Sequence, residues 1–371
     1  MADEFQDVDA QQYRLLRLLA GGAGNLCVIG DPDQAIYGFR GADSGCFARF
    51  SRDFPAARSL RLKANYRSTG TIVTAAAALM DAAAEGITRP MADPIGTHVA
   101  SDETAEAAFV AAEIEALLGG HDLLTVHRAS GRAGTRPLGF ADCAVLYRTG
   151  AQAAALRATF DRAGIPFQQS TPEPIFGHPG VVAILDVIAE DGAGVELTAR
   201  IAQAAEVARR RNEASPEALA EARGWLAALA ASEAVAGDAA KLREQTALST
   251  EADFRDARAD RVSLLTMHAA KGLEFSIVFV VGMEAGLMPF SWNGAPPEDD
   301  AATQEERRLF YVAVTRARDR LFLTRAAERN WRGTRRTLPP SPFLADIPAG
   351  LIKRYETAAR QRAKTQQLSL F

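Results

Sequence analysis

The chain alternates between two hydrophobic patterns, one with the spacing of a helix and one with the short apolar runs of buried strands. Apolar residues at helical spacing predict helices over 10–19, from 69 onward, and over 105–118, 152–164 and 305–315. Short apolar runs predict strands at 26–29, 59–62, 143–147, 262–266, 277–281 and 321–324. Strands that alternate with helices are typical of a parallel sheet covered by helices, so the expected fold class is α/β.

Two stretches interrupt this alternation. A polar stretch at 89–103 separates the helix that begins near 69 from the next helical run. Residues 181–258 are rich in Ala, Glu and Arg, carry no strand pattern, and contain Pro216, which could open a new helix. We therefore expect an all-helical insertion there.

Composition bounds the class of protein. With 371 residues, 48% of them hydrophobic, the chain can bury a core and divides by length into two or three domains. A net charge of −4 gives no global attraction to nucleic acid, so any DNA contact must come from a local basic surface. Three cysteines without the spacing of a disulfide framework or a zinc site are expected to be buried or idle thiols in a reducing compartment. No leader-like segment and no run of ~18 apolar residues is present, so we expect a cytoplasmic protein with no membrane partner.

Five short segments occur in a fixed order along the chain. They are Asp3-Glu4-Phe5-Gln6-Asp7, Gly30-Asp31-Pro32-Asp33-Gln34, Asn65-Tyr66-Arg67-Ser68, the run from His268 to Phe275, and Val314-Thr315-Arg316-Ala317-Arg318. Together they resemble motifs II to VI of the UvrD/Rep/PcrA-type superfamily 1 DNA helicases. The resemblance implies RecA-like sheets of the P-loop NTPase type, one partial and one complete lobe.

The resemblance also implies a division of the chain. Residues 1–62 would be the remainder of a first RecA-like domain, 63–180 and 259–348 the two parts of a second, 181–258 a shortened accessory subdomain, and 349–371 a C-terminal tail. No G-x-x-x-x-G-K-[ST] loop, which holds nucleotide phosphates, occurs in the sequence. We therefore expect an N-terminally truncated helicase that hydrolyses ATP poorly or not at all by itself.

The first lobe carries carboxylates and an amide suited to triphosphate hydrolysis, which needs a hard cation and a group that orients water. By resemblance Asp3 would hold Mg²⁺, Glu4 would act as the base, and Gln34 would sense the terminal phosphate of ATP. Only Met1-Ala2 stands where the family has an apolar strand before this pair, so we expect the carboxylates to lack a rigid platform. Taken alone, the acidic cluster also fits a plain helix start.

The second lobe would close on the same nucleotide. By resemblance Arg67 and Arg316 meet the γ-phosphate, Tyr66 stacks on the adenine, and Glu274 contacts the ribose or phosphate region. Gly272 permits close approach of the backbone. Three other arginines in the last motif region, Arg307, Arg308 and Arg318, are expected to be solvent-facing charge.

Aromatic side chains beside an arginine are candidates for single-stranded DNA, because unstacked bases bind to aromatic faces without regard to sequence. Tyr37 and Phe39 are the stacking candidates, with Arg40 on backbone phosphate or in the interface between the lobes. The alternative is core packing after a strand. By resemblance His268 also contacts DNA, although a histidine in an apolar segment is more often structural.

The chain ends in a short pattern of paired apolar residues. Gln367, Leu368, Leu370 and Phe371 resemble the sliding-clamp-binding peptide of bacterial replication and repair proteins. The expected function is thus that of an ATP-dependent 3′→5′ DNA helicase of repair or replication. The alternative is a non-catalytic DNA-binding module tethered to a sliding clamp.

Overall fold

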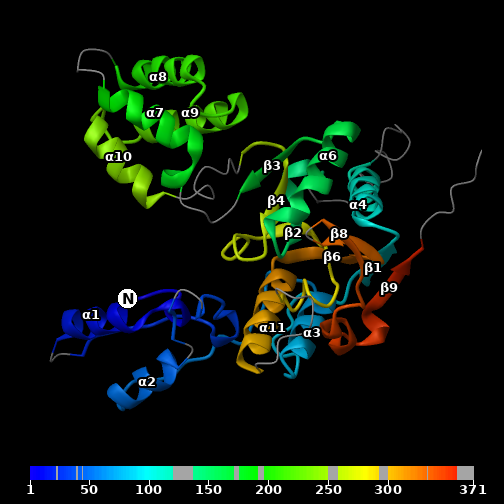
Figure 1. Ribbon diagram of the computed structural model, residues 1–371. Coiled ribbons are helices and arrows are strands. Elements are labelled where there is room, and N and C mark those ends of the chain that lie inside the picture. The colour runs from blue at the N-terminus through cyan, green and yellow to red at the C-terminus, as the bar shows by residue number, and fades with distance from the viewer. Residues whose placement is uncertain are drawn as a thin grey trace, which may run out of the picture.

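A seven-stranded sheet in which every neighbouring pair is parallel forms the centre of the computed structural model (Figure 1). The structure describes residues 1–21, 24–38, 41–43, 45–119, 137–170, 175–190, 196–249, 258–291, 300–331 and 333–356. In spatial order the strands are β3 (Phe167–Ser170), β4 (Val262–Thr266), β2 (Cys143–Tyr147), β5 (Phe275–Val280), β6 (Ala317–Ala326), β1 (Ile95–Ala100) and β9 (Ile352–Tyr355). The expected α/β class is confirmed.

Helices cover both faces of this sheet (Figure 1). One face packs against α3 (Gly70–Leu79) and α11 (Asp300–Thr315), and the other against α4 (Glu103–Leu117) and α6 (Ala153–Ala163). Successive β5 residues contribute to the two cores in turn, Val278 to the first and Phe279 to the second. Because both faces are buried, the central strands appear in the sequence as continuous apolar runs.

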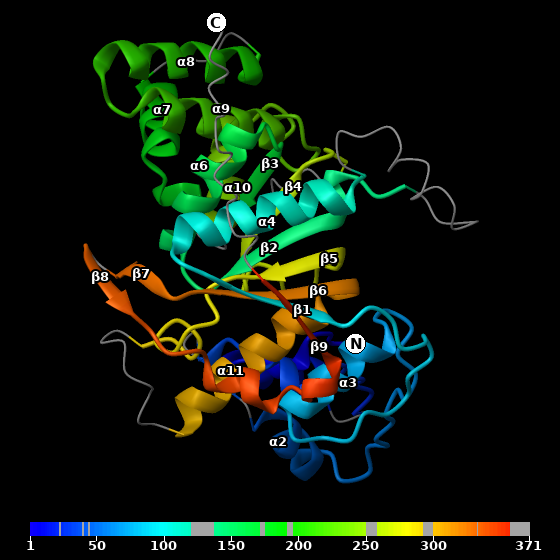
Figure 2. The same ribbon diagram turned by 90° about the vertical axis from the view of Figure 1, so that its right-hand side faces the viewer.

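Four helices form a separate bundle set apart from the sheet (Figures 1 and 2). They are α7 (Pro179–Glu190), α8 (Leu197–Arg211), α9 (Pro216–Ala230) and α10 (Ala239–Leu248). The bundle has its own buried core, to which Ile184, Ile201 and Leu226 belong. Pro216 occupies the first turn of α9, as the sequence predicted, and Ser215 caps this helix.

In its described residues, the N-terminal segment 1–62 has helices but no sheet. It contains α1 (Ala10–Ala20), α2 (Cys46–Asp53) and the short turns η1 (Phe5–Asp7) and η2 (Pro32–Gln34). The strands expected at 26–29 and 59–62 are wrong: Val28 makes one bridge to Ala2, and Leu60 and Leu62 are 83% and 93% exposed. Apolar residues adopt a strand when a neighbouring strand pairs with them, and the described residues supply none here.

Five of the described strands, β1, β3, β7, β8 and β9, escaped the sequence patterns. β9 lies within residues 349–371, so the expectation that this whole segment is a tail is wrong. β1 falls in the polar stretch 89–103, yet it pairs with both β6 and β9. Its buried His98 is satisfied by a 2.9 Å hydrogen-bonding contact between Nδ1 and the Tyr355 carbonyl, and its ring stacks on Phe109. Beyond β6, the antiparallel pair β7 (Glu328–Trp331) and β8 (Thr334–Thr337) forms a hairpin.

Candidate functional site

A buried guanidinium lies at the end of α11. Arg316 is 2% exposed, and its Nε donates to the Val312 carbonyl at 3.0 Å. One terminal nitrogen donates to the Leu273 carbonyl at 3.2 Å, and the other lies 3.5 Å from Oε1 of Gln34. Burial, with the like charge of Arg67 nearby, lowers the pKa of Arg316 to about 10. The part of the chain that contains the seven-stranded sheet, called the second lobe below, therefore directs a buried positive charge at the N-terminal segment.

An ion-pair cluster lies beside it. Arg67 Nε lies 2.6 Å from one oxygen of Glu274, and an Arg318 terminal nitrogen lies 3.5 Å from the other. Contrary to the expectation of purely solvent-facing charge, Arg318 thus shares a carboxylate with Arg67. Each of these side chains is between two fifths and one half exposed, so a ligand could reach the cluster.

The turn that carries Arg67 is fixed by its own side chains. The Asn65 side-chain oxygen accepts hydrogen bonds from the backbone N–H groups of Arg67 and Ser68, both at 3.1 Å. The Ser68 hydroxyl donates to the Ala317 carbonyl at 2.6 Å, which ties the turn to the start of β6. These contacts give the residue types of this motif a structural reason.

Gln34 ends the short turn η2 rather than a strand. Asp31 caps this turn by accepting from the Asp33 N–H at 3.0 Å, and its second oxygen accepts from the Gln34 amide at 3.0 Å. The amide nitrogen of Gln34 is therefore held by its own turn, and its oxygen faces Arg316. Gln34 is fixed at the junction between the N-terminal segment and the second lobe.

The two N-terminal carboxylates stand on a small platform. Ala2 hydrogen-bonds to both Cys27 and Ile29 at 2.8 Å, and the fully buried Phe5 anchors the following turn. Asp3 and Glu4 between them are exposed, and Glu4 adopts the left-handed conformation at φ 50°. The expectation that the two carboxylates lack any support is therefore corrected. The hydrogen bonds of Ala2 and the buried ring of Phe5 hold the chain on either side of them.

Lys271 links the second lobe to the N-terminal segment, and the sequence patterns did not single it out. Its side chain is only 6% exposed and its ammonium pairs with Asp7, donates to the Gln34 carbonyl at 2.9 Å and lies 3.6 Å from Glu4. The ammonium also lies 5.1 Å from the centre of the Tyr37 ring. Burial raises the pKa of Asp7, although Lys271 acts to lower it.

The DNA-contact candidates are placed only in part. The Tyr37 hydroxyl lies 3.5 Å from the His268 carbonyl, and the two half-buried rings are 6.3 Å apart. Phe39 and Arg40 lie outside the described residues, as does the C-terminal pattern of Gln367, Leu368, Leu370 and Phe371. Tyr37 also packs against the core of the second lobe, so the core-packing alternative describes part of its surroundings.

The remaining candidates face open space. Tyr66 is 76% exposed, and Gly272 has a positive φ of 81° with no atom near the position of a Cβ. Among the described residues no group of three or more His, Cys, Asp or Glu side chains could hold a metal. Mg²⁺ usually takes only one or two protein carboxylates and completes its shell with phosphates and water, so an exposed carboxylate such as Asp3 fits this kind of site.

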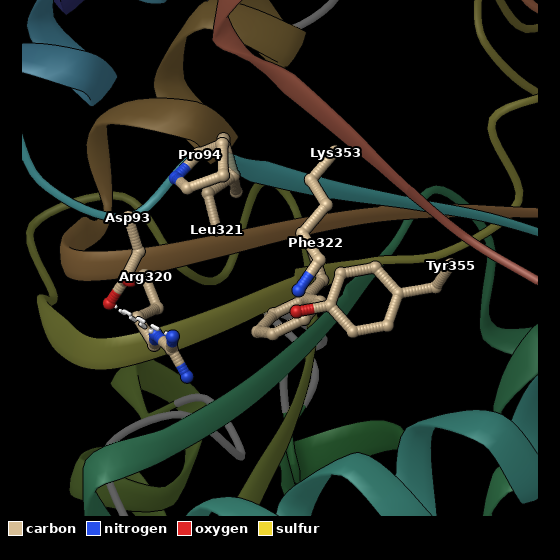
Figure 3. Close-up of a pocket in the computed structure, with 7 residues that line it drawn as sticks. All are labelled: Asp93, Pro94, Arg320, Leu321, Phe322, Lys353 and Tyr355. Atoms are coloured by element: carbon tan, nitrogen blue, oxygen red, sulfur yellow. Dashed lines mark hydrogen bonds and ion pairs between the residues drawn. The ribbon is translucent and has the colours of Figure 1, made fainter.

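A small cavity lies beside β6, β9 and the chain before β1, away from the motif residues (Figure 3). Its volume of about 30 Å³ is on the scale of a water molecule. Arg320 and Asp93 form an ion pair on its wall, with nitrogen–oxygen distances of 2.9 and 3.0 Å.

In the part of the chain that the structure describes, no helix is long and apolar enough to cross a membrane.

Four predicted site residues from distant parts of the chain come together. They are Gln34, Arg67, Glu274 and Arg316. Arg316 contacts Gln34, Arg67 pairs with Glu274, and the charges of Arg67 and Glu274 both act on the pKa of Arg316. Two models of known protein families match the chain. The model of the UvrD-like helicase C-terminal domain matches residues 60–189 and 200–328, and that of the UvrD/REP helicase N-terminal domain matches residues 1–55.

The chain belongs to the UvrD-like helicase family. It is 30% identical to proteins named ATP-dependent DNA helicase PcrA from Staphylococcus aureus strain Mu50 and Staphylococcus epidermidis strain RP62A. Each alignment covers 97% of this chain and 59% of the relative, so the chain spans less than two thirds of the length of these relatives. A solved C-terminal domain of a possible DNA helicase from Lactobacillus plantarum WCFS1 matches over 78% of this chain and 99% of its own, at 15% identity and a TM-score of 0.36.

Proposed function

We propose that this chain supplies the downstream part of an ATP-driven motor that moves 3′→5′ along single-stranded DNA. The observation that carries the proposal is the contact between Arg316 and Gln34, because it joins the second lobe to the N-terminal segment at the motif residues. Two arginines and an amide gathered at such a junction suit the three equatorial oxygens of a transferred phosphoryl group. The relatives' names, ATP-dependent DNA helicase, support the same substrate.

In this proposal each residue of the junction has one task. Arg316 and Arg67 bind the terminal phosphate, and Gln34 orients the attacking water while Glu4 accepts its proton. Glu274 holds Arg67 until the nucleotide arrives, then contacts the ribose or phosphate region, while Tyr66 offers an exposed ring to the adenine. Bound Mg²⁺, held by Asp3 directly or through water, supplies charge neutralisation at the phosphate oxygens.

Movement would follow from the same geometry. The N-terminal segment and the second lobe meet through Gln34, Lys271 and Arg316, so gain or loss of a triphosphate at this junction changes how the two parts are held. Tyr37 lies in the same junction and would carry the change to single-stranded DNA, together with Phe39, Arg40 and His268. We also propose that residue 62 ends the first lobe, and that the tail contacts a sliding clamp.

Side-chain magnetic resonance of isotope-labelled arginine tests the nucleotide site even if binding is weak. During titration with MgATP, the Nε–H signals of Arg67 and Arg316 should shift, and MgADP should shift them less. Arg320 is the matched control because it is an ion-paired arginine on β6, outside the junction. The proposal fails if MgATP at millimolar concentration moves neither junction signal.

Turnover tests a separate part of the proposal. Because the 371 residues contain no phosphate-binding loop, this polypeptide by itself should hydrolyse ATP weakly or not at all, with or without single-stranded DNA. Strong DNA-stimulated hydrolysis by the purified chain would contradict this expectation. Tight DNA binding that nucleotide does not alter would instead favour a non-catalytic DNA-binding module.

A further inference from the structure

Arg89 lies behind the Arg67 turn, on the connection between α3 and β1. One of its terminal nitrogens donates to the Arg67 carbonyl at 2.6 Å and to the Arg318 carbonyl at 3.0 Å. Its other terminal nitrogen lies 2.6 Å from a carboxylate oxygen of Asp319. Arg89 thus joins the backbones of the two arginines that share Glu274.

The residues on either side of Arg89 also hydrogen-bond to the segment that contains the Arg67 turn. Asn65 N–H donates to the Gly86 carbonyl at 2.8 Å, and the Thr88 hydroxyl donates to the Asn65 carbonyl. Gly70 N–H donates to the Pro90 carbonyl at 3.0 Å. Gly86 has a φ of 65°, and a Cβ there would meet the Lys63 carbonyl at 1.4 Å, so only glycine allows this approach.

We propose that Arg89 is a positioning residue that sets the direction of Arg67 and Arg318 toward the shared carboxylate of Glu274. A planar guanidinium offers several N–H donors in a fixed fork, so one side chain can hold two carbonyls and a carboxylate at once. Lysine has a single point of charge and lacks that geometry. The inference rests on the proposed function only where it extends to the phosphate that Arg67 would bind.

The charge of Arg89 is matched locally. Asp319 pairs with Arg89 and balances its charge. Arg89 can therefore hold the Arg67 and Arg318 carbonyls without adding an uncompensated positive charge to this cluster of arginines. The pair is partly exposed, at 33% for Arg89 and 42% for Asp319, and an ion pair of this exposure contributes little to global stability. Loss of Arg89 should therefore disturb the direction of Arg67 more than the fold.

The chain offers a control pair of almost equal exposure. Arg320 and Asp93 are 31% and 47% exposed and form an ion pair on the neighbouring part of the sheet (Figure 3). No hydrogen bond to the Arg67 turn is described for this pair. Arg89→Ala and Arg320→Ala therefore remove the same chemical group at similar exposure. Only Arg89→Ala removes the hydrogen bonds to the Arg67 and Arg318 carbonyls.

The test follows the Arg67 Nε–H signal in the full chain without nucleotide. In R89A, solvent exchange of this proton should accelerate about tenfold, the equivalent of one lost hydrogen bond, and its chemical shift should move. R320A should leave both unchanged, and R89K should resemble R89A because lysine lacks the fork. Thermal unfolding and circular dichroism should be the same for R89A and R320A.

The outcomes separate this inference from the proposed function. An unchanged Arg67 signal in R89A, or full rescue by R89K, overturns the positioning role whatever nucleotide does. If R89A moves the Arg67 signal but MgATP never affects it in the wild-type chain, the positioning role stands and the nucleotide site fails. If MgATP shifts Arg67 in the wild-type chain, R89A should reduce that shift while R320A preserves it.

Discussion

Lys271 and Asp7, 264 residues apart in the sequence, form an ion pair that is largely closed to solvent. The pair joins the second lobe to the turn that follows the N-terminal carboxylates. Because Lys271 also donates to the Gln34 carbonyl, a single ammonium holds two of the helicase motifs at once. The junction between the lobes therefore depends on one lysine as well as on the arginines proposed for phosphate.

Replacing Lys271 with methionine should loosen this junction. The substitution keeps the length of the side chain but leaves the partly buried Asp7 without its cation, at a cost of about 2 kcal/mol for a charged hydrogen bond. Limited proteolysis should then cut residues 1–62 faster than in the wild-type chain. Lys353→Met is a control at an exposed lysine of β9, and equal cleavage of both variants would argue against the link.

The parts of this fold that the sequence predicted are those in which local pattern and final environment agree. Cys143–Tyr147 is an unbroken apolar run, and every residue of it is buried in the centre of the sheet. The N-terminal segment shows the opposite case. Leu60 and Leu62 have strand-like neighbours in sequence, but in the described structure no strand pairs with them.

Polar residues in the sheet and contacts across the chain could not be predicted in this way. His98 suits β1 only because the Tyr355 carbonyl and the Phe109 ring meet its imidazole, and both come from other elements. Gln34 and Arg316 were found through the order of the motifs. Their contact, like that of Lys271 with Asp7, depends on how distant segments pack.

Two tyrosines should separate the binding of DNA from the binding of nucleotide. Tyr37→Ala should weaken single-stranded DNA binding by ~1–3 kcal/mol, the usual contribution of one aromatic stacking contact. Tyr66→Ala should leave DNA affinity unchanged, because its exposed ring is proposed to face the adenine. Fluorescence anisotropy with a labelled oligonucleotide measures both, and an equal loss in the two variants would contradict the assignment.

The three cysteines should differ sharply in reactivity. Cys27 is exposed, whereas burial raises the pKa of Cys143 to about 12 and also raises that of Cys46. Because the thiolate is the reactive species, only Cys27 should react with a thiol reagent at about pH 8 in the folded chain. Cys27→Ser should abolish this labelling. Rapid reaction of a second thiol before unfolding would contradict the buried placement.

Removal of the buried Arg329 should make the free energy of unfolding depend more strongly on pH. Arg329 lies between Glu284, with contacts of 2.8 and 2.9 Å, and Glu106, and all three are almost fully buried. Arg329→Met leaves two unpaired buried carboxylates, which should cost ~3–5 kcal/mol near neutral pH. Burial already raises the pKa of Glu284 with the arginine present, and without it the pKa should rise further.

A carboxyl whose folded-state pKa is raised favours folding when protonated, so its contribution is present at low pH and lost as pH rises through the folded pKa. The penalty of R329M should therefore be largest near neutral pH and shrink as pH falls toward the ordinary glutamate range. Denaturant unfolding of R329M and the wild-type chain across pH measures the difference. R329M/E284Q should be less destabilised than R329M near neutral pH, because it removes one of the stranded charges. A penalty that stayed constant across pH would show that lost packing, rather than stranded charge, sets the stability of R329M.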